Sequence, residues 1–230
     1  MYATVTSAVV LAAGLGTRLA WLTRERPKAM MNLAGEPAIV HVIRALAAQG
    51  VRFLAINVHY RPERIMAALG DGSALGVHIR YSREDHLLDS GGGVRQAMEL
   101  LPDDECVLVH NADILTDLPL ALLARKLPAG KGGVLGLVPN PPHHPSGDFS
   151  CHAGRMARTK PRPWTYAGVS LWHRQTLALW PAGARFPLTD CIEACMNDGN
   201  CTGAIHRGFW VDIGRPADLF RADAYLRQRM

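Results

Sequence analysis

The sequence of 230 residues contains no long apolar stretch, few lysines and no cysteine spacing typical of a metal site. No apolar stretch approaches the roughly 20 residues that a membrane-spanning helix needs, so we expect no membrane partner. The odd number of cysteines, five, indicates free thiols in a reducing compartment, and we expect a cytoplasmic protein. The apolar stretch near the N-terminus has no basic leader and runs directly into a glycine loop, which predicts a strand and not a signal peptide.

Positive charge is spread thinly along the chain. Only four of the 25 basic residues are lysines, the net charge is +5, and no run of basic residues is longer than two. Binding of polymeric nucleic acid usually needs a clustered basic patch, so we expect no nucleic-acid partner. Arginine also suits a pocket for multiply charged phosphates, and the composition therefore favours a small phosphorylated ligand.

Apolar stretches alternate with amphipathic ones in the first part of the chain. Continuous apolar residues predict buried strands over residues 8–13, 51–58, 77–81 and 106–109. Helices are expected over residues 37–49 and 62–69, and another is expected to follow a triple glycine and end near residue 100. This alternation predicts an α/β fold with a doubly wound, mostly parallel, Rossmann-like sheet and helices on both faces. After residue 130, we expect strands over residues 164–172 and 204–211 and a helix over residues 216–227.

The stretch after the first strand has two close glycines, Gly14 and Gly16, followed by two cations, Arg18 and Lys28. A dinucleotide fingerprint would need a third glycine where Leu19 stands, and the Gly-Lys-Ser/Thr ending of a Walker loop is absent. Backbone N–H groups alone can hold a passive cofactor, whereas nucleotidyl transfer needs cations where charge develops on phosphorus. The loop therefore favours transfer chemistry over hydride transfer. The alternative is that both cations are solvated surface residues.

Residues 11–30, LAAGLGTRLAWLTRERPKAM, resemble the signature of the sugar-1-phosphate nucleotidylyltransferases. The resemblance implies one domain over residues 1–230, with a nucleotide-binding part in residues 1–130 and a small sugar-phosphate-binding sub-lobe in residues 131–230. It implies that Arg18 and Lys28 are catalytic. The residues that it places against the nucleotide are Leu11, Ala12, Ala13, Gly14, Gly16 and Thr17.

Shorter stretches indicate, by resemblance, which nucleotide and which sugar 1-phosphate the protein uses. LGDGSALGVHIRYS, the triple glycine, NPPHHPSGDF, YAGVSLW and GFWVDIG are similar to stretches in family members of bacterial cell-wall recycling. They imply UTP and N-acetylmuramate α-1-phosphate as substrates, and we expect a monomer or a homodimer. One alternative is GTP with mannose 1-phosphate or a heptose 1-phosphate. Another is a non-catalytic nucleotide-binding regulatory subunit, suggested by departures from the family pattern at His86, Ala112 and Thr159.

Two aspartates are the candidates for a metal site. Asp113 follows one predicted strand and Asp212 ends a later one, so both are expected at the edge of the sheet where ligands bind in such folds. Two carboxylates suit one Mg²⁺ that also takes phosphate oxygens, although either aspartate alone could be a helix N-cap. The resemblance implies that Asn111-Ala112-Asp113 is the family's metal motif, with Asp212 as the second ligand and Asn111 beside the nucleotide.

The resemblance also implies that the triple glycine, Gly91, Gly92 and Gly93, forms the turn that binds the nucleobase. His86 is expected at the position before this turn where relatives often have glutamate. By themselves, three glycines could equally be a flexible turn.

Three further residues are implied to bind the sugar phosphate. Lys160 is expected to hold the phosphate, and Asp148 and Gly168 are expected to contact the sugar. From residue type alone, Lys160 could be a surface lysine and Asp148 could cap a turn. Four residues are interpreted as structural: His143 and His144 as loop histidines, and Asp117 and Asp218 as parts of a solvated helix start and helix face.

Overall fold

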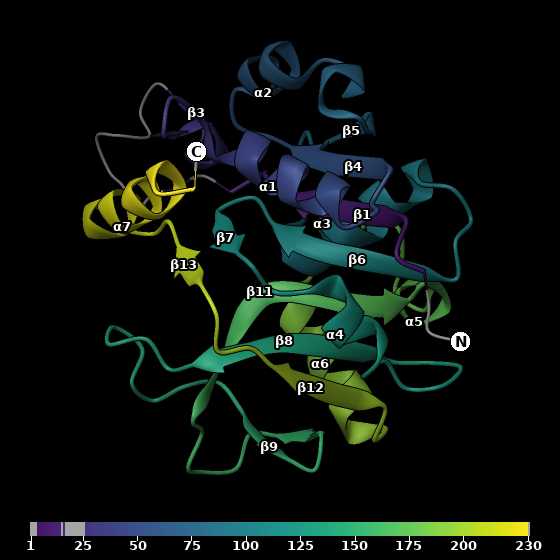
Figure 1. Ribbon diagram of the computed structural model, residues 1–230. Helices are drawn as coiled ribbons and strands as arrows, with labels where there is room; N and C mark the ends of the chain where they lie inside the picture. Colours follow the sequence, from purple (N-terminus) through teal and green to yellow (C-terminus); the bar gives the residue numbers. More distant parts are fainter. Residues whose placement is uncertain (1–3, 15, 17–25, 230) are drawn as a thin grey trace.

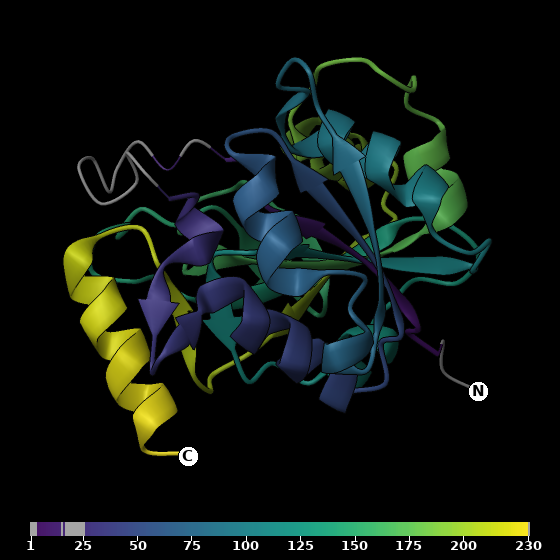
Figure 2. The same ribbon diagram turned by 90° about the horizontal axis from the view of Figure 1, so that it is seen from above.

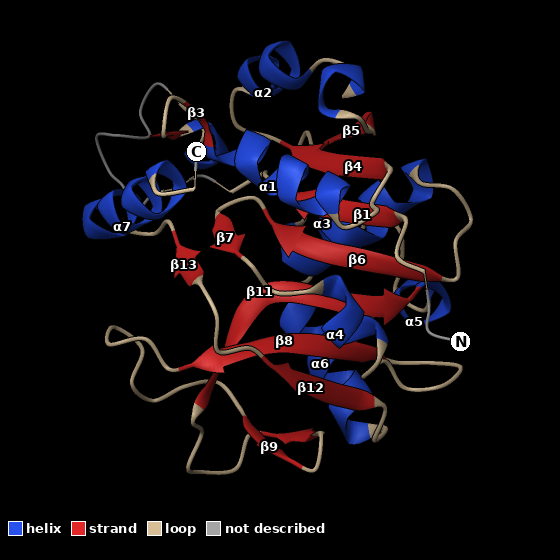
Figure 3. Cartoon of the chain, in the orientation of Figure 1, coloured by secondary structure: helices blue, strands red, loops and turns tan. Residues whose placement is uncertain are grey.

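The computed structural model describes residues 4–14, 16 and 26–229, and within them nine strands form one continuous sheet (Figures 1 and 3). The strand order is β5-β4-β1-β6-β11-β8-β12-β10-β9. The strands are β1 (Ser7–Leu11), β4 (Phe53–Val58), β5 (His78–Arg83), β6 (Cys106–Asn111), β8 (Gly133–Pro139), β9 (Ser150–His152), β10 (Arg155–Ala157), β11 (Trp164–His173) and β12 (Cys201–Ile205). Both predicted parts of the chain therefore share one sheet, and their division near residue 130 stays a prediction.

Most strands of this sheet run in the same direction. β5, β4, β1 and β6 are parallel to one another, and β8 is parallel to β12. β11 lies antiparallel between β6 and β8, and β10 lies antiparallel between β12 and β9. The predicted mostly parallel sheet is confirmed, with β11 and β10 as the reversed strands.

Helices cover both faces of the sheet, as predicted. They are α1 (Ala38–Ala48), α2 (Pro62–Leu69), α3 (Asp89–Ala97), α4 (Leu120–Ala124), α5 (Arg174–Ala178), α6 (Leu188–Asn197) and α7 (Pro216–Arg227). Buried side chains of α1, α2 and α4 belong to one apolar core, and those of α3, α5 and α6 belong to another on the opposite face (Figure 1). Along β1, Ala8 and Val10 join the first core and Val9 joins the second, because successive strand side chains point to opposite faces.

One predicted strand is two separate strands in the structure. Residues 204–211 were expected to form one strand, but β12 ends at Ile205 and β13 (Trp210–Asp212) begins after a turn. β13 leaves the main sheet and pairs with β7 (Ile114–Thr116) in an antiparallel ribbon. This ribbon connects the end of β6 to the C-terminal part of the chain.

The expected nucleobase turn is also different, because the triple glycine lies inside the first turns of α3 (Asp89–Ala97). A Cβ atom at Gly91 would lie 2.5 Å from the ring of Phe186, and one at Gly92 would lie 2.2 Å from the carbonyl oxygen of Ala184. Glycine is needed here because α3 packs this closely against the segment that precedes α6, and a side chain would push the two apart.

The last helix closes the fold against a short hairpin. β2 (Asn32–Leu33) and β3 (Glu36–Pro37) lie beside α7, seen as the purple hairpin and the yellow helix of Figure 2. The amide of Ala34 donates a 2.7 Å hydrogen bond to Oδ1 of Asp223 on α7. All the cysteines carry free thiols, as expected. Across the described residues, we find no helix with the length and apolar character needed to span a membrane.

Candidate active site

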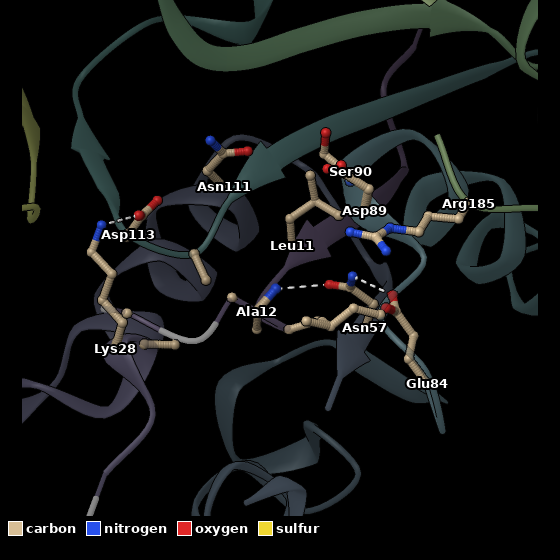
Figure 4. Close-up of a pocket in the computed structure, with 16 residues that line it drawn as sticks. Leu11, Ala12, Lys28, Asn57, Glu84, Asp89, Ser90, Asn111, Asp113 and Arg185 are labelled. Atoms are coloured by element: carbon tan, nitrogen blue, oxygen red, sulfur yellow. Dashed lines mark hydrogen bonds and ion pairs between the residues drawn. The ribbon is translucent and has the colours of Figure 1, made fainter. Parts of the chain in front are cut away.

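A cavity of about 460 Å³ opens at the carboxyl ends of β1, β4 and β6, and we call it the β1 cavity (Figure 4). Ligands of open α/β sheets bind at this edge. Its lining residues are Leu11, Ala12, Ala13, Gly14, Gly16, Lys28, Ala29, Asn57, Glu84, Leu87, Asp89, Ser90, Asn111, Ala112, Asp113 and Arg185. The structure thus brings most of the predicted nucleotide-binding residues together. Thr17 and Arg18 lie outside the described residues.

A second cavity of about 370 Å³ adjoins the first, and we call it the β11 cavity. The two cavities share Asn111 and Asp113. The other residues that line the β11 cavity are Ile114, His143, His144, Thr165, Tyr166, Gly168, Trp210 and Asp212. Two ligands in these cavities would meet at the shared residues.

The two candidate metal ligands lie at this junction, on either side of one lysine. Nζ of Lys28 donates to a carboxylate oxygen of Asp113 and, at 3.1 Å, to Oδ1 of Asp212. The side chains of Lys28, Asp113 and Asp212 are only 11, 24 and 19 % exposed. Figure 4 shows Lys28 reaching Asp113 from below the end of β6. The pairing of β7 with β13 explains the meeting, because it sets Asp212 opposite Ile114, the neighbour of Asp113.

This donor set fits a magnesium ion. Two carboxylates that already share one cation, the Lys28 ammonium, can share another, and Mg²⁺ prefers one or two carboxylates together with phosphate oxygens and water. Among the described residues, no group of three or more His, Cys, Asp or Glu side chains could hold a metal by itself. A bound phosphate and water could supply further ligands of such an ion.

Asn57 and Glu84 are residues of the β1 cavity that the sequence analysis missed. Both are buried, and the Asn57 amide bridges the glycine loop to Glu84. Oδ1 of Asn57 accepts from the amide of Ala12 at 2.7 Å, and its Nδ2 donates to Oε1 of Glu84 at 2.8 Å (Figure 4). Glu84 also accepts from the amide of Leu88 at 3.0 Å, at the start of α3. A single asparagine within the apolar stretch of β4 was the signal that could have found this pair.

His86 does not line the β1 cavity, and its correspondence to the glutamate position of relatives stays a prediction. Glu84 directly follows β5, so its side chain lines the cavity, whereas His86 is exposed and does not line it.

Gly168 and Asn111 form the wall between β11 and the junction. Gly168 has a φ of +70° at a register shift in β11, and a Cβ atom there would lie 2.9 Å from Nδ2 of Asn111 and 2.7 Å from Ile114. Glycine is required at this position by both the positive φ and the close approach. His110 precedes Asn111 and is buried, and this burial lowers the pKa of His110 to about 4, which keeps its ring neutral.

Asp148 and Lys160, two predicted sugar-phosphate residues, are not among the residues that line the β11 cavity. The Asp148 carboxylate accepts from Nε2 of His144 at 2.9 Å and from the amide of Tyr166 at 2.9 Å. It therefore positions two residues that line the β11 cavity. Lys160 is exposed in the segment between β10 and β11.

The interpretation of Asp218 as a solvated helix residue is wrong. Its side chain is 4 % exposed and forms two hydrogen bonds with the Arg215 guanidinium, at 2.9 and 3.0 Å. Asp117 is partly exposed, as expected before α4, and contacts Nε2 of His206 at 2.8 Å.

Comparison with known proteins yields matches over most of the chain. The nucleotidyl transferase family matches residues 7–149. N-acetylmuramate alpha-1-phosphate uridylyltransferase of Neisseria meningitidis serogroup B is 35% identical over 94% of this chain and 96% of that protein. Mannose-1-phosphate guanylyltransferase of Mycobacterium tuberculosis is 31% identical over 95% of this chain and 64% of that protein. HddC of Yersinia pseudotuberculosis, solved in complex with GMP-PN, has a TM-score of 0.82, with 20% identity over 98% of this chain and 100% of that chain.

Proposed function

The chain belongs to the nucleotidyl transferase family and is a sugar-1-phosphate nucleotidyltransferase, and we propose that it transfers a uridylyl group from UTP to N-acetylmuramate α-1-phosphate. The observation that most supports this reaction is the cluster of Lys28, Asp113 and Asp212 where the two cavities meet. A phosphate oxygen of the sugar attacks the α-phosphorus of UTP, pyrophosphate leaves, and UDP-N-acetylmuramate forms. The phosphate monoester is itself a nucleophile, so the protein has to position the substrates and neutralise their charge.

In this proposal, the nucleotide occupies the β1 cavity and the sugar 1-phosphate occupies the β11 cavity. Lys28 binds the nucleotide phosphates together with Arg18. Asp113 and Asp212 hold Mg²⁺, which supplies positive charge against the phosphates of both substrates when it is bound. Gly91 and Gly92 let the start of α3 pack against the segment before α6, and Gly93 lets it approach Asn57 and Glu84 in the wall of the β1 cavity.

The choice of UTP and N-acetylmuramate α-1-phosphate rests on similarity. The uridylyltransferase from Neisseria meningitidis matches nearly the whole of both chains and has the higher identity, 35% against 31% for the guanylyltransferase from Mycobacterium tuberculosis. The second similarity supports GTP and mannose 1-phosphate as the other candidate pair. Formation of UDP-N-acetylmuramate would place the enzyme in peptidoglycan recycling.

A substrate panel tests the proposal. The purified chain is incubated with Mg²⁺ and each of UTP, GTP, CTP and dTTP, against N-acetylmuramate, mannose and N-acetylglucosamine 1-phosphates, and pyrophosphate release is measured. We expect the highest kcat/KM for UTP with N-acetylmuramate α-1-phosphate. A higher kcat/KM for GTP with mannose 1-phosphate would identify GTP and mannose 1-phosphate as the substrates instead. Nucleotide binding without pyrophosphate release for every pair would favour a regulatory subunit.

A further inference from the structure

His143 lines the β11 cavity and is held from behind by a chain of two charged residues. Its Nδ1 lies 2.7 Å from Nη2 of Arg215. Arg215, directly before α7, donates in turn from Nε and Nη2 to the two carboxylate oxygens of Asp218. The carboxylate is buried and the guanidinium is partly exposed, so the pair anchors the Arg215 side chain to α7.

These contacts determine which nitrogen of His143 carries hydrogen. A guanidinium has five N–H donors and no acceptor, so Nδ1 must accept the hydrogen bond from Arg215 and cannot itself be protonated. The hydrogen of the neutral ring therefore sits on Nε2. His143 is exposed, and its partial desolvation and the nearby positive charge of Arg215 lower its pKa, which agrees with a neutral ring. His143 is thus a hydrogen-bond donor through Nε2.

The loop that carries His143 is held in place despite its prolines. Nδ2 of Asn140 donates to the carbonyl oxygens of Pro145, at 3.0 Å, and Arg162, at 2.8 Å. The Thr165 hydroxyl donates to Oδ1 of the same asparagine at 3.0 Å. One side chain thereby ties the loop at both of its ends to the start of β11. His143 is preorganised, so little conformational entropy is lost when a ligand binds.

A phosphate bound in the β11 cavity needs hydrogen-bond donors such as Nε2–H of His143. Asp113 and Asp212 line it, and their negative charge opposes a second anion, while the Lys28 ammonium is already shared between them. Among the described residues that line this cavity, none is a lysine or an arginine. A neutral donor polarised by the guanidinium behind it favours an anionic oxygen over a hydroxyl, because hydrogen bonds to charged acceptors are the stronger ones.

We propose that Nε2–H of His143 donates a hydrogen bond to the phosphate of the sugar 1-phosphate, and that Arg215 and Asp218 are positioning residues that hold it in this tautomer. The proposal rests on the proposed function, since it takes the β11 cavity as the site of the sugar phosphate. It assigns to His143 the task that sequence resemblance gave to Lys160.

Steady-state kinetics of His143→Ala and His143→Gln test the contact. In His143→Ala, we expect KM for the sugar 1-phosphate to rise about tenfold or more, with KM for the nucleotide unchanged. His143→Gln keeps an N–H donor of similar reach and should recover part of the loss. His152→Ala, at an exposed histidine of β9, is the control for loss of an imidazole elsewhere. An unchanged KM for the sugar phosphate in His143→Ala would overturn the proposal.

Inhibition by the free sugar separates a phosphate contact from a hydroxyl contact. N-acetylmuramate without phosphate should inhibit wild type and His143→Ala equally, because the proposed contact is absent from it. An equal loss of affinity for the free sugar and for its 1-phosphate would assign His143 to a hydroxyl and refute the phosphate contact. If the substrate panel identifies another sugar, the same comparison is made with that sugar and its 1-phosphate, so the two proposals fail separately.

Nitrogen NMR of the histidine ring tests the positioning residues without using activity. In the wild type, we expect His143 to show an unprotonated Nδ1 and a protonated Nε2. Arg215→Met should give a mixture of both tautomers, whereas Arg215→Lys, which keeps a donor, should preserve the wild-type signature. A protonated Nδ1 in the wild type, or a tautomer unaffected by Arg215→Met, would contradict the proposed arrangement.

Discussion

Replacing Lys28 with methionine should destabilise the free protein and make its stability depend on magnesium. Methionine keeps most of the length and apolar surface of lysine but removes the cation that Asp113 and Asp212 share. Two carboxylates, mostly shielded from water, would then face each other without the Lys28 ammonium between them. A divalent ion could relieve that repulsion directly, because the position of the ammonium would be free.

The size of the effect follows from the distance and the exposure. A unit charge pair at the 3.1 Å separation of Nζ and the Asp212 oxygen has a Coulomb energy of ~5 kcal/mol at an effective dielectric constant of ~20. The net value is smaller, since exposed pairs contribute about 0–1 kcal/mol and breaking fully buried pairs costs about 3–5 kcal/mol. With side chains 11 to 24 % exposed, we expect a loss of about 2 kcal/mol. For a chain of this size, that loss lowers Tm by about 4–8 °C.

Thermal unfolding with and without Mg²⁺ measures both the loss of stability and its dependence on magnesium. Lys131→Met is the matched control, because its Nζ lies 4.0 Å from Asp198 and both side chains are about two-thirds exposed, at 64 and 66 %. The control should unfold within about 2–4 °C of the wild type. Mg²⁺ should raise the Tm of Lys28→Met more than that of the wild type. Equal melting temperatures for wild type and Lys28→Met, or an equal response to Mg²⁺, would show that Lys28 is not the counter-ion of the aspartate pair.

Three further predictions follow from the same structure. Asp113→Asn should lower kcat at least about 100-fold in the pyrophosphate-release assay while circular dichroism shows an intact fold; wild-type turnover would remove Asp113 from the reaction. Gly168→Ala should lose more stability in urea than Gly183→Ala, by about 1–3 kcal/mol, since both glycines have a positive φ but only Gly168 has neighbours in contact; equal losses would contradict the crowding. The pKa of His110 is lowered to about 4, so the unfolded state takes up the proton first as pH falls, and stability should be lost between about pH 6.5 and pH 4 by up to ~3 kcal/mol. His110→Gln should flatten this pH dependence in urea titrations, and an equally steep curve would assign it to other groups.

Residue types and local spacing predicted most of the fold. The expected helix over residues 216–227 is α7 with the same bounds, and the helix over residues 62–69 is α2. Alternating apolar and amphipathic stretches were enough here, because each element forms from neighbours in the chain and buries the face that its own sequence makes apolar. The strand over residues 204–211 was wrong because the chain leaves the main sheet after Ile205, and residues 210–212 pair with β7 instead.

The candidate site was predicted only where its chemistry is local. Lys28, Asp113 and Asp212 carry charges that a phosphate and a metal need, and the structure places all three at the junction of the cavities. The sequence analysis missed Asn57 and Glu84. A polar side chain is buried when it has hydrogen-bond partners, and the partners of these two residues are known only from the structure.

Pattern and residue type in the chain alone determined an α/β sheet with a glycine loop and cations after its first strand. Tertiary structure alone decided that the triple glycine is part of a helix and that Arg215 orients His143. It also brought Asp212 beside Asp113 through the β7–β13 ribbon. The physical reason is that periodicity reports how a segment buries its own face. Contacts between distant segments depend on strand register and close packing, which no single segment contains.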